Sequence, residues 1–181
     1  IRTSAVHGSV LDLIGNTPMV DVSVLSPNPR VRIIAKLESQ NPFGSVKDRI
    51  ARQMILQAEA DGILQPGQTI LEPSSGNTGI ALAAIAKMRG YPIKILMPTS
   101  VSIERRQMLQ VFGAELILTP GEEGSNGAVK RAQAMAAQHP EWQTTEPFKF
   151  VLTNDMPGLV AAGQKGILEI VAATHSGLTT A

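Results

Sequence analysis

The chain has 181 residues, a length that allows one domain or one domain and part of another. Hydrophobic residues make up 43% of it and charged residues only 17%, so it can bury a core and is not a disordered, self-repelling polymer. Sixteen basic residues balance fifteen acidic ones, and aromatic residues make up 3%. This balance argues against nucleic acid or an anionic membrane surface as the partner.

The sequence contains no cysteine, which excludes a disulfide framework, a thiolate nucleophile and a cysteine-based metal site. The histidines His7, His139 and His175 are far apart and show no metal-ligand spacing, so no metal site is expected. No apolar run approaches the roughly 18 residues of a membrane span, and the first ten residues do not read as a signal peptide. We therefore expect a protein of a reducing compartment, located in the cytoplasm.

Strand-like and helix-like segments alternate along the chain. The expected strands are short and rich in β-branched or other apolar residues, and they cover residues 31–37, 69–71, 93–97, 115–118 and 148–152. The expected helices are recognised by apolar spacing and by glycine or proline at their ends, and they cover residues 46–60, 78–89, 102–112, 128–138 and 159–173. Residues 121–127, GEEGSNG, are expected to form a loop or solvated turn.

This alternation predicts an α/β fold, in which an open, twisted parallel sheet has helices on both faces. Ligands bind such sheets beyond the carboxyl ends of the strands, so the loops that follow strands are the candidate sites. Two of these loops have unusual compositions. They are residues 41–48, NPFGSVKD, which we call the lysine loop, and residues 72–79, EPSSGNTG.

The lysine loop places a lysine at the start of a helix. Ser45 suits the capping position of that helix, and Asp48 in its first turn suits the helix dipole. Lys47 does not, because the positive end of the dipole disfavours a cation by roughly a few tenths of a kcal/mol. The dipole thereby favours the neutral amine, which is the form that makes a Schiff base with an aldehyde. A solvated surface lysine is the alternative interpretation.

The second loop opens a helix with the segment SSGNTG. Hydroxyls, an amide and glycines there accompany the unpaired N–H groups of the first helical turn, which together can seat a carboxylate or a phosphate. An ordinary helix cap is the alternative, although a cap needs only one of these residues. The segment is neither the phosphate loop GxxxxGK[ST] nor the dinucleotide motif GxGxxG.

Four segments together resemble the fold-type II, pyridoxal-phosphate-dependent enzymes of the cysteine synthase (O-acetylserine sulfhydrylase) and cystathionine β-synthase family. They are IGNTP at 14–18, NPFGSVKDR at 41–49, PSSGNTG at 73–79 and MPTSVSIERR at 97–106. The resemblance covers roughly residues 9–142. It implies the tryptophan synthase β-like architecture of that family and pyridoxal 5'-phosphate (PLP) as the cofactor.

The resemblance also implies a role for the residues of both loops. Lys47 is implied to be the catalytic residue that carries the cofactor as a Schiff base, and Asn77 to hydrogen-bond the ring hydroxyl of the cofactor. The residues implied to bind the substrate carboxylate are Ser74, Ser75, Gly76 and Thr78. In the mechanism implied, the freed Lys47 takes the α-proton of an O-acylated serine such as O-acetylserine, acetate leaves, and sulfide or another thiol adds at the β-carbon.

The resemblance weakens after Trp142. Residues 153–155 read Thr-Asn-Asp where the family usually has a glutamine followed by an aromatic residue, and the 181 residues contain no GTGGT-like phosphate loop and no later serine to face the pyridine nitrogen. We expect residues 1–37 to join a larger domain, 38–147 to form a smaller α/β domain, and 148–181 to begin the larger domain. A fragment of a longer enzyme is expected, with a natural short relative as the alternative.

The function expected of the intact protein is that of a cysteine synthase, a transferase of cysteine biosynthesis that acts on small molecules as a homodimer. Three alternatives remain. A cystathionine β-synthase would use homocysteine, a dehydratase would release ammonia from threonine or serine, and a regulatory or scaffold module would keep the fold without catalysis.

Overall fold

The computed structural model describes residues 6–144, so the strand expected at 148–152 and the helix expected at 159–173 lie outside the described residues. Its centre is a four-stranded parallel sheet with the strand order β5-β4-β3-β6. The strands are β3 (Ile70–Glu72), β4 (Ile93–Pro98), β5 (Glu115–Thr119) and β6 (Gln143–Thr144). The parallel pairing confirms the α/β class that the sequence predicts.

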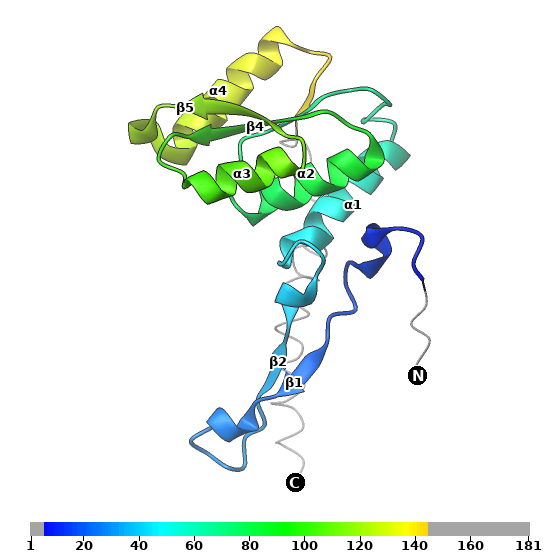
Figure 1. Cartoon of the computed structure of the whole chain (residues 1–181), viewed down its shortest axis with the longest axis vertical. Helices are drawn as coiled ribbons and strands as arrows, with labels where there is room; N and C mark the ends of the chain where they lie inside the picture. The colour runs from blue at the N-terminus through cyan, green and yellow to red at the C-terminus, as the bar shows by residue number, and fades with distance from the viewer. Residues whose placement is uncertain (1–5, 145–181) are drawn as a thin grey trace.

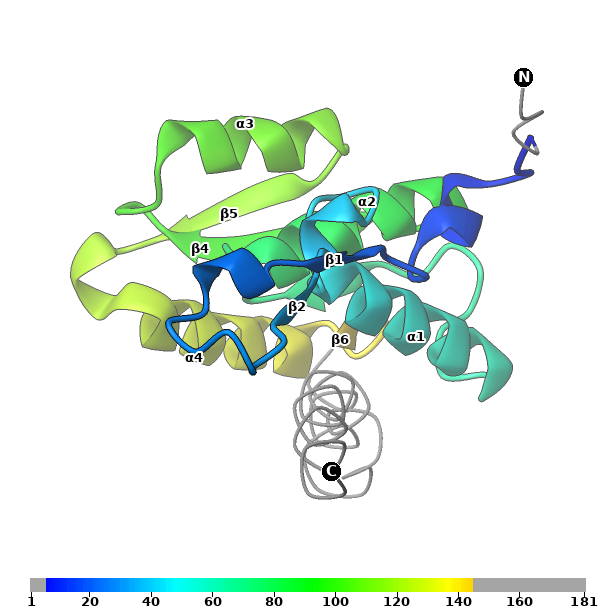
Figure 2. The same cartoon turned by 90° about the horizontal axis from the view of Figure 1, so that it is seen from below.

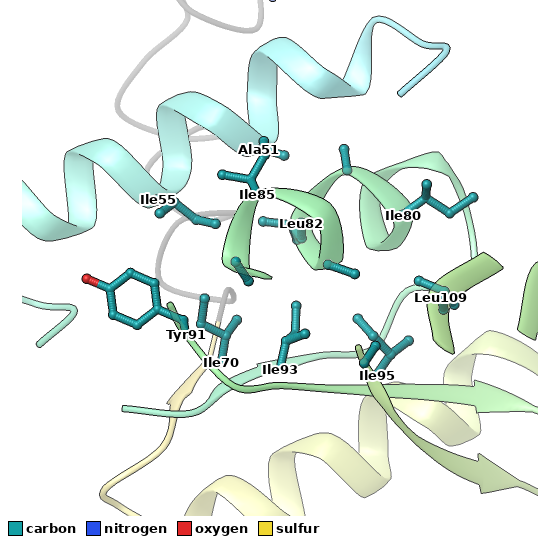
Figure 3. Packing of buried hydrophobic residues seen from close by; sticks show 14 of the residues in the cluster. Ala51, Ile55, Ile70, Ile80, Leu82, Ile85, Tyr91, Ile93, Ile95 and Leu109 are labelled. Atoms are coloured by element: carbon teal, nitrogen blue, oxygen red, sulfur yellow. The ribbon is translucent and has the colours of Figure 1, made fainter. Parts of the chain in front are cut away.

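Helices cover both faces of this sheet (Figure 2). Helix α4 (Gly124–Gln138) lies on one face, and α2 (Asn77–Arg89) and α3 (Ile103–Val111) lie on the other. Helix α1 (Lys47–Ala60) packs on α2 rather than directly on the sheet, so that α2 is enclosed between α1 and the strands (Figure 3).

The enclosed position of α2 follows from its composition. Residues 80–86, IALAAIA, are all buried, which is expected of a helix that is apolar on every side. Leu82 and Ile85 of α2 belong to one buried cluster with Ile55 of α1 and with Ile93 and Ile95 of β4 (Figure 3). This cluster is the main core of the described residues, and it fixes α1 and α2 against each other.

The opposite face of the sheet has a smaller core. Leu71 of β3 and Leu96 of β4 are fully buried there against Ala128 and Ala132 of α4. Neighbouring residues of each strand therefore enter different cores, as expected when a parallel strand has helices on both sides.

The N-terminal part forms a separate antiparallel ribbon of β1 (Met19–Asp21) and β2 (Ile34–Lys36). The ribbon extends away from the four-stranded sheet (Figure 1). The strand expected at 31–37 is therefore shorter than predicted, and its expected place in the parallel sheet is wrong among the described residues. Composition indicates that a segment can be a strand, but its pairing partner depends on tertiary contacts. Short 3-10 turns surround the ribbon: η1 (Val10–Leu13), η2 (Ser23–Leu25) and η3 (Glu38–Gln40).

Two further expectations need correction. Residues 121–127 are not a loop, because they form a 3-10 turn (η4, Gly121–Glu123) and the first turn of α4. The glycine, serine and asparagine content suggests a turn, but packing of Ala128 against the sheet lets the helix begin four residues earlier than expected. Strand β6 was not predicted, since its two residues are too few to show a pattern.

Candidate functional site

The packing of α1 on α2 brings the two candidate loops to the same end of the helix pair. The guanidinium of Arg89, near the end of α2, pairs with the carboxylate of Glu59, near the end of α1, at 2.6 Å (Nη2–Oε2) and 3.0 Å (Nε–Oε1). Lys47 precedes Glu59 by as many residues as Asn77 precedes Arg89, so the two helices run in the same direction from a common end. The order of the labelled residues along both helices shows the same direction (Figure 3).

Lys47 is the first residue of α1 and is half-buried. Its backbone N–H donates to the hydroxyl oxygen of Ser45 at 3.1 Å. The N-cap residue of α1 is Val46 rather than the expected Ser45, which lies one residue earlier and holds the start of the helix through this hydrogen bond. The turn before it needs a glycine, because Gly44 has φ +83° and its N–H donates to the carbonyl oxygen of Asn41 at 2.8 Å. Within residues 6–144 the Nζ atom of Lys47 makes no hydrogen bond or ion pair, which leaves the amine available to a ligand.

Asp48 is completely buried, which its place in the first turn of a helix did not predict. Its Oδ2 accepts the backbone N–H of Phe43 at 2.7 Å, and its Oδ1 accepts the hydroxyl of Ser45 at 3.4 Å. Burial raises the pKa of the Asp48 carboxyl, and the hydrogen bonds from Phe43 and Ser45 oppose that shift. The contact between Ser45 and Asp48 could have been predicted from the sequence, since Ser-x-x-Asp has the spacing of a capping box.

A second carboxylate, Glu38, joins the N-terminal segment 14–18 to the lysine loop. The Arg49 guanidinium donates to it at 2.8 Å (Nε–Oε2) and 3.0 Å (Nη2–Oε1), the Thr17 hydroxyl at 2.6 Å and the Asn41 amide at 2.9 Å. Arg49, helped by the Thr17 and Asn41 hydrogen bonds and opposed by burial, lowers the pKa of Glu38 to about 2. Asn41 Oδ1 in turn accepts the N–H of Gly15 at 2.8 Å. Two of the four family-like segments are thus held together, a connection that sequence reasoning missed.

The second loop, residues 74–78, opens α2 with free donors; we call it the SSGNT loop. Gly76 is the N-cap residue and no side chain caps the helix. Ile80 donates to the Gly76 carbonyl oxygen at 3.2 Å, so the N–H groups of residues 77–79 precede the first bond within the helix. In the described part of the chain, the side chains of the loop also make no hydrogen bonds. They are Ser74, Ser75, Asn77 and Thr78.

Gly79 explains how the SSGNT loop keeps its shape. A Cβ atom at this position would lie 2.1 Å from the carbonyl oxygen of Ser74, so only glycine lets the loop backbone rest on the first turn of α2. The unpaired N–H groups, the hydroxyls and the positive end of the helix dipole then face the same region, which suits a carboxylate or phosphate.

Helix α3 contacts both loops. Arg105 Nη1 donates to the Ser75 carbonyl oxygen at 3.3 Å, and the Phe112 ring packs edge-on against Phe43 with 5.8 Å between ring centroids. Arg105 is exposed and Arg106 half-buried, and both donate to backbone carbonyl oxygens. Helix α3 is therefore part of the framework of the site.

Two other kinds of site are not found in the described ranges. No group of three or more histidine or acidic side chains among residues 6–144 could hold a metal ion. None of the helices described there combines the length and apolar character needed to cross a membrane.

In residues 6–144, an α/β sheet places a lysine with an unpaired amine at one helix start and a loop with free donors at the neighbouring start, an arrangement that suits a cofactor-dependent enzyme. The family described as "Pyridoxal-phosphate dependent enzyme" matches residues 10–179, and the chain belongs to this family. The fold class and the resemblance stated from the sequence are confirmed by this match.

The relatives that the chain resembles are mostly named as cysteine synthases. A probable cysteine synthase of Bacillus subtilis (strain 168) is 50% identical over 129 residues, which are 71% of this chain and 42% of that protein. A cysteine synthase of a Flavobacterium species is 49% identical over 132 residues, which are 73% and 43% of the two chains.

Solved structures agree with these relatives. A cysteine synthase from Entamoeba histolytica superposes with a TM-score of 0.75 at 40% identity, over 80% of this chain and 44% of that one. An O-ureido-L-serine synthase superposes with a TM-score of 0.73 at 43% identity, over 77% and 44% of the two chains. The chain thus spans less than half the length of these relatives.

The residues present fit the cofactor of the family. PLP offers an aldehyde that bonds to a lysine amine, and Lys47 is half-buried, with its Nζ unpaired among the described residues. The unpaired donors of the SSGNT loop lie at the same end of the helix pair and complement the anionic groups of a cofactor and an amino-acid substrate.

Proposed function

We propose that this chain forms the lysine-bearing part of a PLP-dependent cysteine synthase, which replaces the acyloxy group of an O-acylated serine with sulfide to give L-cysteine. The observation that carries the proposal is the common end of α1 and α2. There, within the described part of the chain, a lysine without a partner and a donor-rich loop without a side-chain cap stand on neighbouring helices. The similarity to proteins named cysteine synthase supports the choice of reaction.

Lys47 has two tasks in this proposal. Bound PLP supplies an electron sink for the negative charge that develops at the substrate Cα. Lys47 holds the cofactor covalently through Nζ, and once Nζ is released it takes the α-proton of the substrate and later returns it. Because Lys47 stands on the first turn of a packed helix, its amine is delivered from a fixed backbone position. Asn77 directs its amide at the ring hydroxyl of the cofactor.

The SSGNT loop orients the substrate. Its members Ser74, Ser75, Gly76 and Thr78 bind the substrate carboxylate with hydroxyl and backbone donors, and each such charge-assisted hydrogen bond contributes about 1.5–3 kcal/mol. The dipole of α2 adds to this attraction. Holding the carboxylate fixes the Cα–H bond relative to Lys47 and keeps water away from the reacting atoms.

The assay uses the protein at the full length that its gene encodes, supplied with PLP. We expect cysteine from O-acetylserine and sulfide, and we expect Lys47→Ala to lower the rate by at least about 100-fold, because the base is lost. Lys87→Ala is the matched control, since Lys87 is exposed at the other end of α2 and, among residues 6–144, donates only to the Val111 carbonyl oxygen. Full activity in Lys47→Ala contradicts the assignment.

The same preparation separates the alternatives. Cystathionine formed from homocysteine, in preference to cysteine from sulfide, identifies a cystathionine β-synthase. Release of ammonia and a keto acid from threonine or serine identifies a dehydratase. No change in the PLP absorption spectrum at high PLP concentration identifies a non-catalytic module.

We also propose the organisation expected from the sequence: residues 1–37 join a larger domain, 38–147 form the smaller domain, and 148–181 begin the larger one. The separation of the β1–β2 ribbon from the four-stranded sheet supports the first boundary (Figure 1). A homodimer acting in the cytoplasm is the assembly and location that we propose. Sedimentation velocity of the full-length protein tests the dimer, and a single monomeric species contradicts it.

A further inference from the structure

Asp48 lies directly after Lys47 and is buried, although the stability of its helix does not require a buried carboxylate there. An acidic residue in the first turn benefits the helix dipole equally well on the surface, and the Ser45 hydroxyl already accepts the Lys47 N–H. Burying a carboxylate is unfavourable unless hydrogen bonds compensate, yet Asp48 has no exposed surface. A buried carboxylate beside the candidate catalytic lysine therefore needs an explanation beyond helix stability.

The contacts of Asp48 lead back to the backbone of Lys47. Asp48 Oδ2 accepts the Phe43 N–H at 2.7 Å, and Oδ1 accepts the Ser45 hydroxyl at 3.4 Å. The same Ser45 oxygen accepts the Lys47 N–H at 3.1 Å. One carboxylate thus holds the turn at residue 43, at residue 45 and, through Ser45, at residue 47.

The rest of the turn is held from the outside. Asn41 is fixed by the Gly15 N–H and by Glu38, and the Phe43 ring packs on Phe112 at the end of α3. These contacts anchor the start of the lysine loop, whereas the segment between residues 43 and 47 is joined internally by Asp48. Loss of its carboxylate would free the backbone from which the Lys47 side chain extends.

We propose that Asp48 is a positioning residue for Lys47, whose buried carboxylate holds the turn of residues 43–47 so that the lysine amine meets the cofactor aldehyde from one fixed direction. This inference rests on the proposed function, because it presumes that Lys47 bonds to PLP. A displacement of about 1 Å in a reacting group can lower a rate by about 100-fold, so a loosened turn is expected to have a measurable effect.

The first test measures, without cofactor, how often the hydrogen bonds of the turn open. Asp48→Asn keeps the shape but replaces a charged acceptor with a neutral one, and we expect amide hydrogen exchange at Phe43 and Lys47 to become about tenfold faster or more. Ile55→Val is the control, since Ile55 is buried on the same helix, eight residues after Lys47. Unchanged exchange at Phe43 in Asp48→Asn overturns the inference.

The second test measures delivery of the amine, using the full-length protein and PLP with borohydride trapping. We expect Asp48→Asn to bond PLP at Lys47 about 10- to 100-fold more slowly than the unmodified protein, and Ile55→Val to match the unmodified rate even where its melting temperature falls equally. Ser45→Ala removes the hydrogen bonds of the Ser45 hydroxyl with Asp48 and with the Lys47 N–H but keeps the bond from the Phe43 N–H to Asp48, so it should slow bonding less and in the same direction. It carries the test if Asp48→Asn does not fold.

The outcomes of the second test separate the inference from the proposed function. No PLP on Lys47 in the unmodified protein overturns the proposed function and with it the role of Asp48 in PLP capture, while the exchange experiment still reports whether Asp48 holds the turn. If the unmodified protein captures PLP normally and both Asp48→Asn and Ser45→Ala capture it at the unmodified rate, the positioning role alone is overturned. The positioning role is also overturned if Ile55→Val slows PLP capture as much as Asp48→Asn does, because the slowing would then result from the lower stability of the folded protein.

Discussion

Glu38 receives hydrogen bonds from Thr17, Asn41 and Arg49, and its ionisation makes folding sensitive to acid. Arg49 is the main cause of its low pKa, which is about 2 in the folded chain against 4.5 as the ordinary value. An acid whose pKa is lowered by folding stabilises the folded state above its ordinary pKa and loses that contribution as the pH falls through the lower value.

We therefore expect the free energy of unfolding to decrease between about pH 5 and pH 2, with Glu38 accounting for up to about 3 kcal/mol of the change. Glu38→Gln should remove this part of the pH dependence, and Glu122→Gln, an exposed site, should not. Burial raises the pKa of Asp48, which acts in the opposite sense, so the comparison must be made within each variant across pH. Urea unfolding at several pH values measures it, and identical acid sensitivity in Glu38→Gln and the unmodified chain contradicts the account.

Gly79 provides a second test at the level of a residue. An alanine Cβ would lie 2.1 Å from the Ser74 carbonyl oxygen, which is backbone and cannot rotate away. We expect Gly79→Ala to displace the SSGNT loop, to lower the free energy of unfolding by about 1–3 kcal/mol and to weaken PLP capture. Gly8→Ala is the control, since its Cβ would meet only the Asp12 carboxylate at 4.0 Å. A Gly79→Ala chain with normal stability and capture would show that the loop is not held as described.

Helices α1 and α2 are joined by a core and by a surface ion pair, and the two contributions differ in size. The Arg89 side chain is 42% exposed in its pair with Glu59, and exposed pairs contribute about 0–1 kcal/mol. Ile85 is fully buried between the two helices and the sheet, and removing such a side chain to alanine costs about 2–5 kcal/mol.

The core should therefore dominate the pairing of the helices. We expect Ile85→Ala to lower the free energy of unfolding several times more than Arg89→Ala, as measured by urea unfolding at neutral pH. A larger loss in Arg89→Ala would mean that the ion pair, rather than the core, sets the common direction of α1 and α2.

The helices were the most predictable elements. The expected spans 46–60 and 102–112 differ by one residue at their ends from α1 (Lys47–Ala60) and α3 (Ile103–Val111), because apolar spacing and capping residues are local signals. The β1–β2 pairing and the early start of α4 were not predictable, since each depends on contacts between distant parts of the chain.

The candidate site was predictable to a similar degree. Both loops follow from composition and from the expected position after strands, but the burial of Asp48 and the pairing of Glu38 with Arg49 do not. A buried carboxylate and an exposed one look the same in sequence, and only the folded chain shows which neighbours replace water. Sequence motifs therefore indicate the candidate site, while the structure shows which contacts hold its two loops.

At the scale of the whole molecule, the described residues present one side of a site. The four-stranded sheet and its helices place Lys47 and the SSGNT loop at a common end, and the chain spans less than half the length of its relatives. This arrangement supports our proposal that PLP binds covalently to Lys47.

Borohydride reduction of the protein with PLP, followed by mass spectrometry of its peptides, tests this assignment most directly. The account predicts that the reduced PLP label is found on Lys47 and disappears in Lys47→Ala, with Lys36, Lys87, Lys94 and Lys130 unlabelled at stoichiometric PLP. A label spread over the surface lysines, or one that persists at another lysine when Lys47 is replaced, would contradict it.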